Sequence, residues 1–203
     1  MRITTTQKSK TFSFVQIDEV LWGILSNRVL LRLSVSIHTE TALPDLQVNR
    51  LIEELEKYGW DRFMNFLTFR ERSMWECTQY LRNLPLHQTI SEKLISRAET
   101  YNYISDQRFA EIMTRSLCEN GKSRLVISNK LREKRISPDL IEQYLAEYYY
   151  SQEDQILQEN LEKALARYSR FPQKERIEKI KNYLYRKGFG YSNIMEVLAK
   201  NGV

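Results

Sequence analysis

Four side chains near the C-terminus have the types and the spacing that suit binding of an anionic partner. Arg176, Lys179, Tyr183 and Arg186 follow one another at steps of three, four and three residues, which on a helix places them within about a quarter turn of one another. The cations can contact phosphates, and the ring can stack on a base or on a side chain. A solvated helix face with a half-buried tyrosine gives the same pattern, so both interpretations stay open at this point.

Two further groups of basic residues occur earlier in the chain. Lys130 and Lys134 are four residues apart and would share a helix face, with other cations around them. Each group alone is unspecific, but their recurrence at equivalent positions of a repeat favours one basic surface. The candidate binding residues are Arg70, Arg72, Lys122, Arg124, Lys130, Arg132, Lys134, Arg135, Arg176, Lys179, Tyr183, Arg186 and Lys187.

The sequence holds none of the motifs that are typical of enzymes. Gly188 and Gly190 form the only close glycine pair, and no third glycine completes a phosphate-cradling loop. Neither G-x-S-x-G nor H-E-x-x-H occurs. His38 and His87 have no spacing to a cysteine that would suggest a metal site. We therefore expect a protein without catalytic residues, cofactor or metal.

The distribution of charge limits the classes of partner. The chain has 203 residues and a net charge of +5, but the seven cations and seven acids before Asp61 cancel. The positive excess therefore lies in residues 61–203, which favours a polyanionic partner about as much as a well-solvated surface. Cys77 and Cys118 are expected to be separate thiols in a reducing compartment. No apolar run resembles a signal peptide or a membrane span, so we expect a soluble, cytoplasmic monomer with no membrane partner.

The helices that must carry the basic residues repeat along the chain. Four apolar residues follow at steps of five, five and four in two segments, and a third segment shortens one step. With six glycines and four prolines in the whole chain, this period of roughly fifty residues predicts a mainly α fold of tandem three-helix repeats. Since one such unit cannot bury its apolar face alone, the repeats should stack into an elongated body. The three sets are Leu81, Leu86, Ile90 and Leu94; Leu131, Ile136, Ile141 and Leu145; and Leu184, Phe189, Ile194 and Leu198.

A small β-hairpin is expected before the repeats. Residues 12–17 alternate with period two, residues 18–19 give an acidic break, and residues 20–25 read as a second strand. The polar residues 1–10 are expected to be loose. A helix that precedes the repeats is expected to end at Gly59. The predicted domains are 1–59, with the hairpin and short helices, and three helical repeats over 60–103, 104–150 and 151–203.

Local signals also mark several helix ends. Ser73 and Glu76 have the spacing of a capping box, in which each side chain accepts a hydrogen bond from the other residue's amide. Ser137 and Pro138 suit the cap and first turn of a helix. Gly188 stands where a helix end needs a left-handed residue. These signals predict where the repeats turn.

Several of these motifs, taken in order, resemble the RecX family of bacterial recombination regulators. The resemblance covers about residues 60–203, and its most characteristic stretch is 104–110, an apolar residue followed by polar-Asp-x-Arg-Phe-Ala. Ser123 and Arg124 replace a Gly-Pro of the family pattern, and Arg135 replaces the glycine that usually ends that helix. Arg135 must therefore adopt a left-handed conformation, or the helix must end differently. The segments that carry the resemblance are 70–81, 104–110, 114–116, 121–136 and 186–194.

The resemblance implies a regulator of RecA. Proteins of this family bind RecA, mostly as its filament on single-stranded DNA, and restrain its recombinase and coprotease activity. Some bind DNA directly, and the family has no catalytic residues. Two alternatives stay open: a helical protein that binds DNA directly without a RecA-specific role, and a helical scaffold for another partner. Direct DNA binding would weaken with salt by about 0.7 to 0.9 log units per contacted phosphate for each tenfold step.

Overall fold

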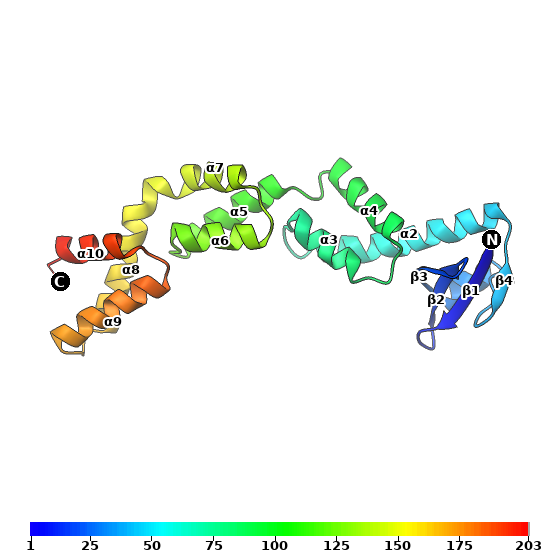
Figure 1. Ribbon diagram of the computed structural model, residues 1–203, viewed down its shortest axis with the longest axis horizontal. Helices are drawn as coiled ribbons and strands as arrows, with labels where there is room; N and C mark the ends of the chain where they lie inside the picture. The colour runs from blue at the N-terminus through cyan, green and yellow to red at the C-terminus, as the bar shows by residue number, and fades with distance from the viewer. Residues whose placement is uncertain (203) are drawn as a thin grey trace. The chain divides into compact units, whose positions relative to one another are not determined.

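The chain divides into two compact units, Met1–Ser105 and Asp106–Val203. The computed structural model describes residues 1–202. Helices dominate both units, and the first unit also holds a four-stranded antiparallel sheet (Figure 1). The predicted mainly α fold with a small β element at its N-terminus is thus confirmed.

The sheet of the first unit is larger than the predicted hairpin. The prediction that residues 1–10 are loose is wrong, because Ile3 and Thr5 point into the core and are 0% and 2% exposed. The buried Thr5 hydroxyl donates to the carbonyl of Ser36 at 2.9 Å. A run of β-branched threonines suits a strand, and this outweighs the polar composition. The strands, in the spatial order β3-β2-β1-β4, are β1 (Arg2–Gln7), β2 (Phe12–Ile17), β3 (Val20–Ser26) and β4 (Glu40–Ala42).

The predicted hairpin is confirmed as β2 and β3, which pair antiparallel. Its turn residues Asp18 and Glu19 both have positive φ, 47° and 69°, as the twist of a two-residue hairpin turn requires. Asp18 is suited to this position because its Oδ1 accepts a hydrogen bond from the amide of Arg2 at 2.8 Å. Ser26 then caps the short helix α1 (Asn27–Arg32).

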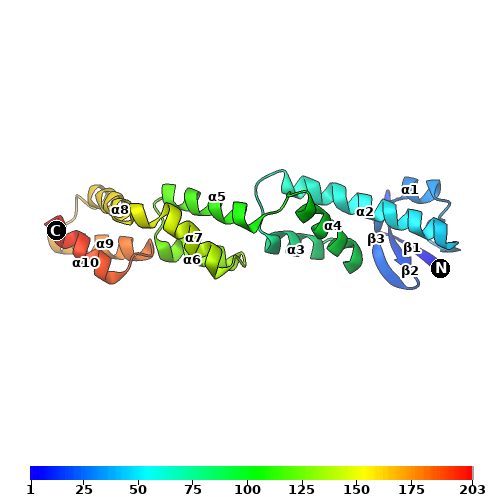
Figure 2. The ribbon, with the colours of Figure 1, turned by 90° about the horizontal axis from the view of Figure 1, so that it is seen from above.

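Helix α2 (Asp45–Leu67) passes straight through the predicted helix end at Gly59. Gly59 is buried, and a Cβ at this position would lie 2.8 Å from both Leu86 Cδ1 and Leu94 Cδ1. The prediction is wrong because the glycine allows close packing against these leucines and does not end the helix. Figure 2 shows α2 running beside the strands, where it contacts β3.

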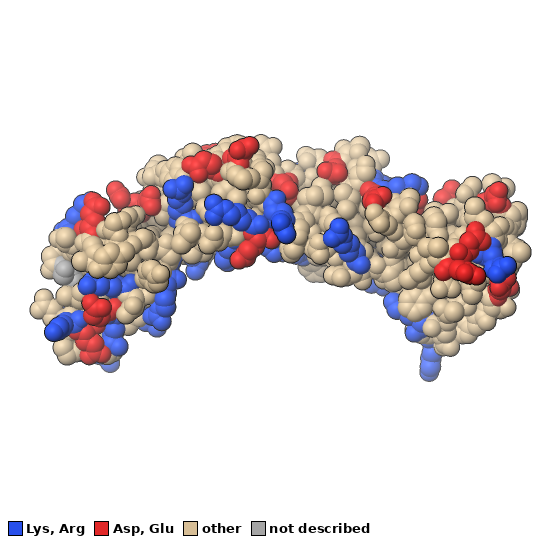
Figure 3. Space-filling view, viewed as in Figure 1, with Lys and Arg blue, Asp and Glu red and all other residues tan. Residues whose placement is uncertain are grey.

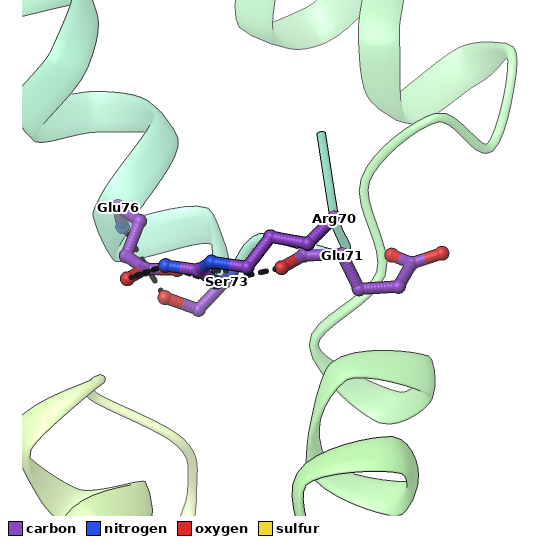
Figure 4. Close-up of polar contacts among 4 residues, drawn as sticks. All are labelled: Arg70, Glu71, Ser73 and Glu76. Carbon is purple, nitrogen blue, oxygen red and sulfur yellow. Dashed lines mark hydrogen bonds and ion pairs between the residues drawn. The ribbon is translucent and has the colours of Figure 1, made fainter. Parts of the chain in front are cut away.

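A capping box opens the next helix, as predicted. Helix α3 (Met74–Arg82) begins after Ser73, whose hydroxyl accepts from the Glu76 amide at 3.2 Å, and the Glu76 carboxylate accepts from the Ser73 amide at 3.4 Å. Arg70 adds two hydrogen bonds to the same carboxylate, at 2.8 and 3.0 Å (Figure 4). Helix α4 (Gln88–Thr100) follows and completes the core of this unit.

Removal of this cap is expected to lower the stability of the first unit. Ser73→Ala takes away the hydroxyl that satisfies an orphan amide, which costs about 1 kcal/mol in the free energy of unfolding. All three tryptophans lie in this unit, so urea denaturation followed by tryptophan fluorescence reports on it. The control is Ser96→Ala, an exposed serine inside α4, where alanine favours the helix. An unchanged midpoint for Ser73→Ala would mean that the cap contributes no stability.

The second unit consists of two consecutive groups of three helices. The short 3-10 helix η1 (Tyr150–Gln152) connects the groups. Asn160 ties them further, because its buried Nδ2 donates to the carbonyl of Gly121 at 3.0 Å. The helices are α5 (Asp106–Glu119), α6 (Arg124–Glu133), α7 (Pro138–Tyr148), α8 (Glu153–Arg167), α9 (Gln173–Arg186) and α10 (Tyr191–Lys200).

The repeated apolar residues occupy the same places in both groups. In each group the first residue lies on the second helix, the next lies in the turn, and the last two face inward from the third helix. All of them are at most 4% exposed, so the repeat observed in the sequence is the core of this unit. The residues are Leu131, Ile136, Ile141 and Leu145 in the first group, and Leu184, Phe189, Ile194 and Leu198 in the second.

The turn after the second helix of each group contains a left-handed residue. Gly188 has φ +87°, and Arg135, at the equivalent position, has φ +60°. In these turns the amide of the following residue donates to the carbonyl five residues earlier, at 3.2 and 3.1 Å respectively. The chain therefore keeps the same turn where glycine is missing and accepts a left-handed arginine, a strain of about 1 kcal/mol.

Candidate functional site

The predicted basic residues of α9 lie at the edge of the core of the second unit. Ile180 and Leu184 are fully buried, and their burial fixes which side of the helix faces solvent. Arg176 is half-buried and Arg186 is exposed. The α9 face consists of Arg176, Lys179, Tyr183 and Arg186.

Aromatic rings contact one cation of the α9 face, Lys179, and the neighbouring Lys187. Lys179 Nζ lies 4.4 Å from the ring centroid of Phe171. The Tyr183 ring packs edge-on against Tyr168, with centroids 6.4 Å apart, and Lys187 Nζ is 5.4 Å from the Tyr183 centroid. Cations over aromatic faces keep their charge while their stems are ordered. Tyr183 is therefore part of the packing and has only its remaining edge available to a ligand.

Two polar details decide what the α9 face can bind. The buried Arg176 Nε lacks a hydrogen-bond partner among the described residues, although buried polar atoms normally have one. Glu175 Oε1 lies 3.3 Å from Lys179 Nζ and offsets part of the positive charge. Figure 3 shows basic and acidic side chains mixed over α9. The face can accept an oxyanion that competes with Glu175 for Lys179.

The predicted basic stretch around α6 does not form one face. Arg124 and Arg132 both line a cleft on one side of the helix, whereas Lys130 lies on the opposite side at helical pitch. Lys134 caps the C-terminus of the helix, and Arg135 lies in the left-handed turn. The structure thus brings two of these cations together and separates them from the others.

Arg124 is oriented by two contacts. Its Nη2 lies 3.6 Å from Glu142 Oε2, and its guanidinium carbon lies 5.2 Å from the ring centroid of Tyr150. More than half of the Arg124 side chain stays exposed, as does that of Glu142, so the ion pair is weak in water. Arg124 is therefore positioned but still able to bind a further anion.

Arg70 and Arg72 are engaged within the first unit. The hydrogen bonds that Arg70 donates to the Glu76 carboxylate raise the pKa of Arg70. The Arg72 guanidinium carbon lies 4.1 Å from the centroid of Phe66, whose ring stacks on Tyr80 at 4.1 Å, and burial lowers the pKa of Arg72. Contact with a polyanion would have to use the exposed edges of these guanidiniums. The sequence signal for the Arg70 contact is its spacing of six residues from the glutamate of the capping box.

The sequence reasoning missed a cleft of about 350 Å³ in the second unit. We call it the α6–α10 cleft, because the first turns of both helices line it, together with the start of α8. The one sequence signal was the pair Gly188 and Gly190, which precedes α10 and lines the cleft. Its polar lining comprises Ser123, Arg124, Ser128, Arg132, Tyr149, Glu153 and Asn193.

No metal-ligand cluster of three or more His, Cys, Asp or Glu side chains occurs within residues 1–202. None of the helices in this range combines the length and the apolar character that crossing a membrane requires. Cys77 and Cys118 are both buried thiols, and burial raises the pKa of Cys118 to about 11. The Cys118 thiol is therefore protonated and unreactive near neutral pH.

Two family models match the two helix groups of the second unit. One describes the second three-helix domain of RecX and matches residues 105–145. The other describes the third three-helix domain of RecX and matches residues 152–198. The three-helix repeat seen in the core is therefore the repeat that defines these domains.

Whole-chain comparisons agree with the domain matches. The regulatory protein RecX of Streptococcus mutans is 24% identical over 193 residues, which cover 94% of this chain and 73% of that protein. Its counterpart in Bacillus subtilis is 27% identical over 194 residues, covering 94% and 72%. A crystal structure of RecX from Lactobacillus salivarius matches with a TM-score of 0.61 and 26% identity, over 71% of this chain and 95% of that one. A second crystal structure of a regulatory protein RecX, at 19% identity and a TM-score of 0.64 over 96% of both chains, supports the fold alone.

Proposed function

Because the chain belongs to the RecX family, we propose that it binds RecA, as the RecA filament on single-stranded DNA, and inhibits it. The curated relatives are named regulatory proteins, which favours control of another protein over catalysis. Recombinase and coprotease activity both depend on the filament, so one binding event would restrain both.

The α9 face is the observation that best supports this proposal. A filament on DNA presents phosphates and acidic side chains to its surroundings. Arg176, Lys179 and Arg186 offer three cations on one helix side, and Lys187 adds a fourth next to them. Such a cluster attracts a polyanion over about a Debye length, 10 Å at moderate salt, and gains free energy by counterion release. We propose the remaining basic candidates, on α6 and in the first unit, as further contacts, each within its own unit.

ATP hydrolysis by RecA assembled on single-stranded DNA measures the proposed function. We expect the rate of hydrolysis to fall as the protein is added, and to fall less when more RecA filament is present, because filament titrates the inhibitor. Co-sedimentation with the filament measures binding separately. A protein that co-sediments without slowing hydrolysis would contradict the inhibitory role, and a protein that does neither would contradict the partner.

Direct DNA binding is a second candidate function, favoured by the pair of arginines in the α6–α10 cleft. It predicts affinity for single-stranded DNA alone, with a steep loss as salt rises. The RecA-directed proposal instead predicts that RecA on the DNA strengthens binding. Titration of labelled single-stranded DNA with and without RecA, at two salt concentrations, distinguishes the two functions.

A further inference from the structure

The polar groups that converge on the α6–α10 cleft suit one chemical class of ligand, and we propose that this cleft binds a phosphate group. This proposal concerns a site other than the α9 face. It relies on the proposed function only for the expectation that DNA is one source of phosphate. Inorganic phosphates are the other source, with the same chemistry. No sequence motif for phosphate binding marks this position, because the binding groups come from several elements of the second unit.

Two helix N-termini open at this cleft. Gly190 is the N-cap of α10 and offers no side-chain cap, and Asn193 in the first turn of the same helix also lines the cleft. At the start of α6, Ser123 caps the amide of Val126, and Arg124 lines the cleft as the first helical residue. The first amides of a helix carry partial positive charge and point at an anion placed before them.

Two arginines add full charges to these helix ends. Arg124 and Arg132 are eight residues apart on α6, with Ser128 between them, so the three side chains share one side of the helix. Arg132 Nη1 donates to Asn129 Oδ1 at 3.2 Å and is otherwise exposed. A guanidinium can offer two parallel donors to phosphate oxygens, so both arginines can reach a ligand that sits over the helix ends.

Tyr149 provides an observation that is independent of the helix ends. This residue is 0% exposed and its hydroxyl makes no hydrogen bond within residues 1–202, which is unusual for a buried polar atom. Burial raises the pKa of Tyr149 to about 12; the Arg124 backbone, which is close to the hydroxyl, lowers that pKa, and the Glu153 carboxylate, also close to it, raises it further. Both of these residues line the cleft, as Tyr149 does. The hydroxyl is therefore protonated near neutral pH and lies near groups that line the cleft, so a phosphate oxygen bound there would be an acceptor for it.

Glu153 opposes the ligand. Among the described residues that line the cleft, it is the one carboxylate. It also lies in the first turn of α8, where a negative charge favours the helix, which explains its presence without a role in binding. Its charge should weaken phosphate binding, so Glu153→Gln should strengthen it.

A substitution at Gly190 tests the site without harming the fold. Gly190 has φ −67°, and a Cβ there would meet only Asn193 Oδ1 at 4.0 Å, so a side chain fits. Aspartate is a preferred N-cap, so Gly190→Asp should keep or raise the melting temperature while its carboxylate takes the place of the phosphate. Two controls match it. Gly190→Asn has the same shape without the charge, and Ser137→Asp adds the same charge at the N-cap of α7.

The affinity of the full chain is measured for two probes. Binding of inorganic pyrophosphate is followed by calorimetry, and binding of a fluorescein-labelled oligothymidylate by fluorescence anisotropy. We expect Gly190→Asp to weaken binding about tenfold, Tyr149→Phe to weaken it about threefold, and Glu153→Gln to strengthen it about threefold. Gly190→Asn and Ser137→Asp should stay within about twofold of the parent chain. If only the oligothymidylate responds to the substitutions, the ligand is a backbone phosphate. If only pyrophosphate responds, it is a free phosphate.

The proposal is overturned if neither probe binds, or if Gly190→Asp and Ser137→Asp weaken binding equally, because the loss would then reflect net charge alone. Neither probe involves RecA, so this result is separate from that of the proposed function. A chain that binds phosphate but leaves RecA unaffected would contradict only the function. A chain that inhibits RecA but shows no effect of Gly190→Asp on either probe would contradict only the cleft.

Discussion

Replacement of Arg176, Lys179 and Arg186 together by glutamate is expected to weaken binding to RecA on single-stranded DNA by at least about tenfold, or roughly 1.4 kcal/mol. The three cations share the α9 face, and reversal of their charge turns attraction to a polyanion into repulsion. The fold should survive, because the ion pair of Lys179 with Glu175 and the contact of Arg186 with the Asn182 carbonyl are local to the helix and surface pairs contribute little stability.

A matched control separates this face from net charge. Lys163, Arg167 and Arg170 are also exposed cations of the second unit, and their replacement by glutamate changes the net charge by the same amount. We expect this control variant to inhibit RecA's ATP hydrolysis at nearly the concentration that the parent chain needs. Tyr183→Ala should have an intermediate effect, because the ring is partly committed to Tyr168.

The opposite outcome is equally informative. If the α9 variant folds, as judged by far-UV circular dichroism, and inhibits ATP hydrolysis at the parent concentration, the α9 face is a solvated surface. Arg124 and Arg132 then become the best candidates for the contact, because they are the other pair of cations that the structure brings together.

The core of the second unit could be predicted because its signal is local and periodic. Residues such as Leu131 and Leu184 recur at fixed steps within each group, and a helix converts fixed steps into one buried side. Capping residues such as Ser73 and Ser137 could also be predicted from the sequence, because a helix cap depends on only a few neighbouring residues.

Other features depend on contacts between residues far apart in the sequence, and these the sequence did not reveal. Gly59 reads as a helix end, yet it lies inside α2 because Leu86 and Leu94 pack against it. The strand β1 has a polar sequence, and only its partners in the sheet show that Ile3 points inward.

The candidate binding residues also divide into those that local spacing predicts and those that only contacts between distant segments bring together. The α9 face lies on one helix, so spacing alone placed its four residues together. The α6–α10 cleft takes its lining from separate elements, and one of its lining residues is Tyr149. Its hydroxyl became informative only once its burial and missing partner were known.

Gly188→Ala is expected to destabilise the second unit by about 3 kcal/mol. The left-handed conformation at φ +87° costs an alanine about 1 to 2 kcal/mol. Its Cβ would also lie 2.4 Å from Ser123 Oγ and 2.8 Å from Val126 Cγ2, an overpacking that typically costs about 1 to 3 kcal/mol. Thermal unfolding followed by far-UV circular dichroism measures the loss, and the tryptophan fluorescence of the first unit indicates whether it stays local.

Two comparisons test the physical reason for this loss. Gly202 also has positive φ, +65°, but within residues 1–202 no atom outside its chain neighbours lies within 4 Å of the position of its Cβ. Gly202→Ala should therefore show the backbone strain without the clash and cost about 1 kcal/mol. Arg135 already tolerates the equivalent left-handed turn, which means that strain alone does not prevent folding. If Gly188→Ala lowered the free energy of unfolding no more than Gly202→Ala does, the close approach of α6 to this turn would not restrict which residue can stand at position 188. Glycine would then be needed at Gly188 only for its backbone conformation.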